Sequence, residues 1–193
     1  MDLSEYKISI LNAIQSIRVS GVDDLITWLT NETDFFTAPA STKFHGDYEG
    51  GLMIHSWMVY TILREKVSHY KLEVPERAVV LSGLMHDVCK VNFYKRGTRN
   101  VKDEKTGQWS KEVIWMIDDK LPLGHGEESA LLVSRFIRLT DQEMEAIRWH
   151  MGGFTDGASD YIQGITLGAA MNKNKLLVLL NTADIESSHL IET

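Results

Sequence analysis

A histidine and an aspartate stand side by side in the stretch SGLMHDVCK, residues 82–90, whose other residues are mostly apolar and typical of a helix. Burying an unpaired carboxylate beside an imidazole costs several kcal/mol, so His86 and Asp87 need a partner. That partner is another side chain, a structural water or a metal ion. The other polar residues that lie in apolar stretches bear on the choice.

Four residues have similar surroundings, within or beside predicted helices: His55 in GGLMIHSWMV, His125 in PLGHGEES, His150 in IRWHMGG and Asp184 in LLNTADIES. One histidine on an apolar helix is ordinarily a core residue bonded to a backbone carbonyl. Six such residues together favour a metal site, because imidazole and carboxylate suit Mn, Fe, Co, Ni and Zn. A bridging aspartate places two ions about 3.5–4 Å apart, as hydrolytic two-metal sites require.

Helical periodicity dominates the sequence and predicts a mostly α fold. Thr140 and Glu143 resemble a capping box at the start of one helix. Residues 91–121 differ, because β-branched and aromatic residues flank the turn-rich DEKTGQ, and they predict an inserted β-hairpin. The helices are expected at 3–19, 22–29, 51–70, 76–90, 124–139, 140–150 and 172–189, with loops at 31–50 and 152–164.

The composition is that of a single globular domain, with 193 residues, 44% hydrophobic and 24% charged. A net charge of −7 argues against non-specific binding of duplex DNA. Cys89 is the one cysteine, which fits a reducing compartment. The N-terminus lacks the features of a signal peptide, and no run of roughly 18 apolar residues is present. We therefore expect a cytoplasmic protein with no membrane partner and leave its oligomeric state open.

The ordered pattern H…HD…H…H…D on helices resembles the HD-domain superfamily of metal-dependent phosphohydrolases, over roughly residues 36–190. The segment FFTAPASTKFHGDYEGGLMIH is similar to the HD domain of bacterial 3′→5′ exoribonucleases. The resemblance implies an HD-domain helical bundle with a single domain over 1–193. Within it, residues 1–35 form an N-terminal helical segment, 36–193 the metal-site core, and about 91–121 the hairpin.

The resemblance also implies a ligand set for two divalent transition-metal ions, Mn, Fe, Co, Ni or Zn. The first ion is held by His55, His86, Asp87 and Asp184. Asp87 bridges to a second ion held by His125 and His150. The family has glycine before the lysine of its HDxGK motif, whereas this chain has Cys89, which we expect to be inert packing.

Cationic residues near the predicted site suit a phosphate-bearing substrate. Lys90 follows Asp87 by one helical turn, and in the family this lysine contacts a substrate phosphate; alternatively it only complements a helix dipole. Seven Lys/Arg lie between Lys90 and Lys111 against two acids, and we single out Arg96 and Arg99. The alternative is a solvated hairpin whose charges keep its edges from pairing.

Lys43 and His45 lie in the loop before the first predicted ligand. His45 is expected to bond a phosphate oxygen or protonate a leaving group, and the alternative is an exposed loop histidine. The predicted catalytic residues are thus Asp87, Lys90 and His45. The predicted substrate-binding residues are Lys43, Lys90, Arg96 and Arg99.

The function predicted from these residues is hydrolysis of a phosphate ester by a metal-activated water. The expected partner is a phosphate-bearing small molecule or a short oligonucleotide. Two other functions are compatible with the same ligands. One is a mixed-valent di-iron oxygenase, for which oxygen uptake by the iron-loaded protein would be diagnostic. The other is a non-catalytic nucleotide-sensing HD domain, which would bind its ligand without turnover.

Overall fold

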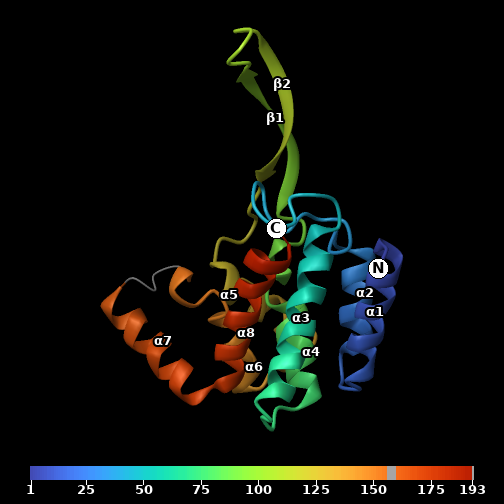
Figure 1. The fold of residues 1–193 in the computed structure, drawn as a ribbon. Helices are drawn as coiled ribbons and strands as arrows, with labels where there is room; N and C mark the ends of the chain where they lie inside the picture. The colour runs from blue at the N-terminus through green and yellow to red at the C-terminus, as the bar shows by residue number, and fades with distance from the viewer. Residues whose placement is uncertain (156–159, 193) are drawn as a thin grey trace.

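The computed structural model describes residues 1–155 and 160–192, which form a helical body with one protruding hairpin (Figure 1). Short 3₁₀ turns follow α4 and α6, and a wider helical turn, Ser187–Ile191, ends the chain. The elements are α1 Leu3–Ser16, α2 Val22–Asn31, α3 Gly51–His69, α4 Glu76–Met85, β1 Tyr94–Lys102, β2 Trp109–Ile117, α5 His125–Ser134, α6 Asp141–Arg148, α7 Tyr161–Lys173 and α8 Lys175–Glu186. The predicted fold class, mostly α with a β-hairpin, is confirmed.

The core lies where α3 and α4 pack against each other and against α6 and α8. Every residue of α4 from Ala78 to Met85 is buried, because its sequence is apolar all round and matches a helix enclosed on every side. Leu52, Leu84 and Leu180 are fully buried at the α3, α4 and α8 contacts. In the described residues no helix has the length and apolar character needed to cross a membrane.

One predicted helix is shorter than expected at its C-terminal end, beside His86 and Asp87. The periodicity predicted a helix over 76–90, but α4 ends at Met85 and a 3₁₀ turn, Val88–Lys90, follows. Asp87 has φ −109° and ψ 19°, a sparsely populated region in which many active-site residues sit. Successive side chains of an α-helix point about 100° apart, so this break lets His86 and Asp87 approach the same centre.

The capping box at Thr140 and Glu143 is confirmed, since each residue bonds the backbone of the other. The loop predicted at 152–164 is wrong in part, because Gly152–Phe154 form a 3₁₀ turn and α7 begins at Tyr161. Residues 156–159 of that prediction lie outside the described residues. The periodicity failed for α7 because the helix is glycine-containing and largely exposed, so it has no clear buried side.

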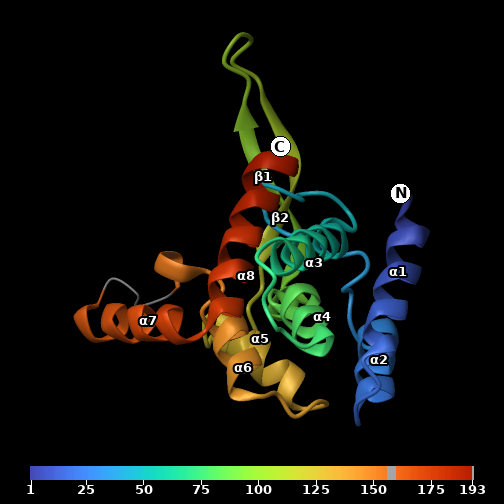
Figure 2. The same cartoon turned by 60° about the horizontal axis from the view of Figure 1, so that its bottom comes forward.

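The predicted hairpin is confirmed. β1 and β2 pair antiparallel with Arg96 opposite Trp115 and Lys102 opposite Trp109. Figures 1 and 2 both show the two strands extending away from the helical body. Among the described residues the hairpin bonds only to itself as a sheet, so it leaves the helical packing around the core uninterrupted.

Gly83 sets the distance between α3 and α4. A Cβ atom at this position would lie 2.7 Å from Tyr60 Cα and 3.0 Å from Tyr60 Cβ, so the backbones could not stay where they are. Since α3 carries His55, and His86 directly follows the end of α4, this close approach also brings those two histidines together.

We therefore expect Gly83→Ala to lower the free energy of unfolding by about 1–3 kcal/mol through overpacking. Gly168→Ala on α7 is the matched control, because its Cβ would meet no atom within 4 Å. That change should stabilise the helix by roughly 0.5–1 kcal/mol. Urea denaturation followed by circular dichroism measures both, and equal midpoints for the two variants would contradict the proposed close contact.

Candidate metal centre

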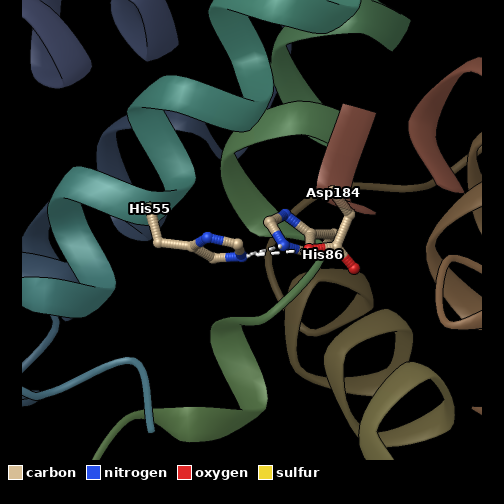
Figure 3. Close-up of side chains that lie close together, drawn as sticks. All are labelled: His55, His86 and Asp184. Carbon is tan, nitrogen blue, oxygen red and sulfur yellow. Dashed lines mark hydrogen bonds and ion pairs between the residues drawn. The ribbon is translucent and has the colours of Figure 1, made fainter. Parts of the chain in front are cut away.

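The six residues predicted as metal ligands come from five separate parts of the chain. His55 lies in the second turn of α3, His86 and Asp87 follow the end of α4, and Asp184 lies on α8. His125 opens α5 and His150 follows the end of α6. Figure 3 shows the side chains of His55 on α3, His86 directly after α4 and Asp184 on α8 pointing toward one another. The helix ends therefore bring together residues that are far apart in sequence.

The inner atoms of this cluster lie very close together. His55 Nε2 is 3.2 Å from His86 Nε2 and 3.2 Å from Asp184 Oδ1. His150 Nε2 is 3.4 Å from Asp87 Oδ1. His55, His86 and His150 are fully buried, and Asp87 is 3% exposed. Water therefore has little access to these charges and lone pairs.

The outer ring nitrogens of three histidines are held by hydrogen bonds that fix which nitrogen faces the centre. His86 Nδ1 donates to the Gly83 carbonyl at 2.9 Å, and His150 Nδ1 donates to the Ile147 carbonyl at 2.7 Å. Because a carbonyl only accepts, Nδ1 carries the hydrogen in both rings, and Nε2 presents a lone pair to the centre whenever the ring is neutral. Metal-ligating histidines are typically oriented in this way.

Glu192 holds His55 in the same manner and was missed by the sequence analysis. His55 Nδ1 donates to Glu192 Oε1 at 2.9 Å, and the Ser187 hydroxyl donates to that same carboxylate oxygen. The Glu192 side chain is 4% exposed. No signal in the sequence distinguishes this glutamate from the chain's other acids, because its role depends on the turn at Ser187–Ile191, which brings it back to α3.

The site concentrates negative charge around basic groups. Burial opposes a charge on His55, but the carboxylates of Asp184 and Glu192 outweigh it and raise the pKa of His55 to about 9. Burial lowers the pKa of His86 to about 4, so that ring is neutral. Burial works against ionised Asp87, but Lys90 and the histidines hold the pKa of Asp87 well below its usual range. The Lys90 ammonium donates to Asp87 Oδ2 at 2.7 Å.

These residues fit a divalent transition-metal ion. Asp87 Oδ1 and His150 Nε2 are buried and make no hydrogen bond among the described residues, which is costly without a cation between or beside them. The donor set of imidazole nitrogens and carboxylate oxygens suits such an ion. Within the described part of the chain, three groups have ligand atoms within 4.8 Å of one another: His55, His86 and Asp184; His86, Asp87 and His150; Asp87, Cys89 and His125.

The grouping of His125 and His150 differs from the expected division between two ions. His125 lies nearest Asp87 and Cys89, whereas His150 lies with His86 and Asp87. His125 Nδ1 is 3.5 Å from Cys89 Sγ, and burial raises the pKa of that thiol. The assignment of His125 and His150 to a shared second ion stays a prediction, as does the number of ions.

A cavity of about 710 Å³ opens beside the cluster and is lined by Asp87, Asp184, Lys90 and His45, with Phe44 and Phe154 exposed at its edge. The His45 ring lies 4.7 Å from the His55 ring, and burial lowers the pKa of His45. The other predicted substrate-binding residues do not line this cavity: Lys43 is exposed on its loop, and Arg96 and Arg99 lie on β1.

These features define a helical domain with a buried histidine–aspartate cluster, suited to divalent metals and open to a cavity. The sequence model of the HD domain matches residues 52–186, which span the cluster from before His55 to beyond Asp184. The chain belongs to the HD-domain family, whose members are generally metal-dependent hydrolases. No curated protein and no solved structure gives a significant match.

We expect Glu192→Ala to weaken metal binding roughly 10- to 100-fold, because loss of a carboxylate that orients a ligand histidine has effects of that size. Calorimetric titration of the metal-free protein with Co²⁺ measures the affinity. Glu186→Ala is the matched control, since Glu186 pairs with Lys66 and contacts no histidine of the cluster. Equal affinities in the two variants would show that Glu192 does not support the site.

Proposed function

We propose that this chain is a metal-dependent phosphohydrolase acting on a nucleotide, a short oligonucleotide or a similar phosphate ester. The observation that carries the proposal is the convergence of buried histidine nitrogens and the oxygens of Asp87 and Asp184 at the wall of a cavity that also holds Lys90. Membership of the HD-domain family supports the same reaction class.

The residues predicted as ligands would hold the metal with His86 and His150 oriented by backbone carbonyls. When bound there, a divalent ion supplies activation of a water molecule at neutral pH. Asp87 accepts a hydrogen bond from Lys90 and faces the histidines, and its side chain also lines the cavity. It therefore lies between the metal-binding side chains and the space for the substrate. Burial of these groups excludes bulk water and strengthens each electrostatic contact.

Two residues in the cavity are placed to bind the phosphate. An ammonium has three donors, and Lys90 gives one to Asp87, which leaves donors for a phosphate oxygen. Burial lowers the pKa of His45, and we assign its ring a hydrogen bond to a phosphate oxygen. The likeness of FFTAPASTKFHGDYEGGLMIH to the exoribonuclease segment supports a nucleotide or oligonucleotide as the substrate.

The test is turnover after anaerobic reconstitution with Mn²⁺, using phosphomonoesters, phosphodiesters, cyclic nucleotides and short RNA. We expect Asp87→Ala to abolish activity, whereas His69→Ala, which changes an exposed histidine outside the cluster, should retain it. Loss of activity in both variants, or in neither, would contradict the assignment. Silence of the wild-type protein, with oxygen uptake by its iron-loaded form, would support the oxygenase instead. Tight nucleotide binding without turnover would support the sensor.

Metal binding should also stabilise the wild-type fold, because an ion that binds only the folded state adds about 2.7 kcal/mol at 100 times its dissociation constant. We expect Mn²⁺ to raise the melting temperature of the wild-type protein and to leave that of Asp87→Ala almost unchanged. Without metal, Asp87→Ala should already melt lower, since buried Lys90 loses its partner. Differential scanning calorimetry measures both effects, and an equal rise in the two proteins would exclude Asp87 as a ligand.

A further inference from the structure

The two faces of the hairpin carry different chemistry. Side chains alternate along each strand, and residues opposite one another share a face. One face, here called the tryptophan face, consists of Tyr94, Arg96, Thr98, Asn100 and Lys102 of β1 with Trp109, Lys111, Val113, Trp115 and Ile117 of β2. Four of these ten residues are aromatic or arginine, and none is acidic.

The cations on the tryptophan face are not neutralised. Among the described residues, Arg96, Lys102 and Lys111 make no ion pair with a carboxylate. The opposite face is different, since Arg99 pairs with Glu112 at 2.9 Å and Lys95 pairs with Asp118 at 3.2 Å. Within the two strands, each Lys or Arg that has no carboxylate partner among the described residues therefore lies on the tryptophan face.

The same face presents aromatic surface. Trp109 is 69% exposed near the outer end of the strands, and the Arg96 guanidinium lies 3.7 Å from the centre of the Trp115 ring. The exposed indole of Trp109 and the Arg96–Trp115 pair therefore lie on the same face as the cations that have no carboxylate partner. Exposed aromatic rings beside unpaired cations form the surface on which unpaired bases stack and phosphates bind.

The inner end of the hairpin lies close to the candidate metal centre. Tyr94, its innermost residue on β1, is half-buried, and its hydroxyl donates to the Ala40 carbonyl at 3.4 Å. Phe93, the residue before it, has its ring 6.0 Å from the ring of His125. Figures 1 and 2 show the C-terminal end of α8 at the foot of the hairpin. The inner end of a molecule bound along this face would therefore lie near the cavity.

We propose that the tryptophan face binds single-stranded nucleic acid and guides it to the cavity. This inference rests on the proposed function and deepens it by naming a polymeric substrate. The hairpin, residues 94–117, holds six Lys/Arg against three Asp/Glu in a chain of net charge −7, so the surrounding surface is acidic. A narrow cationic strip suits one flexible strand, whereas a duplex would bring a second charged backbone over the acidic body.

The test is binding of fluorescein-labelled 12-nucleotide single strands, one of DNA and one of RNA, to the full chain in EDTA, followed by fluorescence anisotropy. EDTA prevents hydrolysis, so binding is measured apart from catalysis. We expect affinity to fall linearly with salt concentration on logarithmic axes, with a slope of about 0.7 per phosphate contact. The triple variant Arg96→Gln/Lys102→Gln/Lys111→Gln should lower that slope by about 2.

The matched control is Lys95→Gln/Lys105→Gln/Lys120→Gln, which removes the same charge from exposed lysines outside the tryptophan face. It should keep nearly the wild-type slope. Trp109→Ala should weaken binding roughly 5- to 150-fold at constant salt, the range for one lost base-stacking contact. Circular dichroism melting of all variants establishes that they remain folded.

Equal losses in the two triple variants would overturn the proposal, because binding would then follow net charge alone. Equal affinity for a 12-base-pair duplex, or no binding by the wild-type protein at low salt, would also overturn it. Hydrolysis of a small diester with no strand binding would refute this inference and leave the proposed function intact. Strand binding without hydrolysis of any ester would refute the proposed function and leave the tryptophan face as a strand-binding surface.

Discussion

The structure depends on how the buried carboxylate of Asp87 is paired with the basic side chains around it. It is nearly fully buried, accepts a hydrogen bond from Lys90, and faces His55, His86 and His150, so four basic side chains surround one carboxylate. Such a group is stable inside a protein only when its partners stay in place. The helices that carry those partners, α4, α6 and the turn after α4, must therefore end where they do.

Close backbone contacts hold these helix ends in place. Gly83 lets α3 and α4 touch, and a Cβ on Gly126 would lie 2.0 Å from the Arg148 carbonyl oxygen, so the start of α5 lies directly on the end of α6. Asn181 of α8 donates to the His150 carbonyl at 2.7 Å. Close backbone contacts and one side-chain hydrogen bond thus hold the site together. Helix packing fixes the positions of its side chains.

Much of this arrangement follows from local sequence. Several features depend only on neighbouring residues and could be predicted from local sequence patterns. They are the apolar surroundings of His55 and His86, the capping box at Thr140 and the β-branched strands of the hairpin. Features that depend on tertiary contacts could not be predicted in this way. The helix ends after Met85 where His86 and Asp87 contact residues of other helices, which local periodicity does not report. Helix α7 is largely exposed, so its sequence has no apolar face with helical spacing. The sequence analysis also grouped Arg96 with Arg99 as substrate-binding residues, although alternation along β1 places their side chains on opposite faces of the hairpin.

The turn at Ser187–Ile191 has a consequence for how the site tolerates change. Its wide spacing, with the Glu192 amide donating to the Ser187 carbonyl at 3.0 Å, adds one residue to an ordinary helical turn. Such insertions within helices are frequent at functional sites. Removing a single residue from this segment would rotate the following position by about 100° and take the carboxylate away from His55. The phase of the last helical turn is thus as important to His55 as the identity of the residue that supports it.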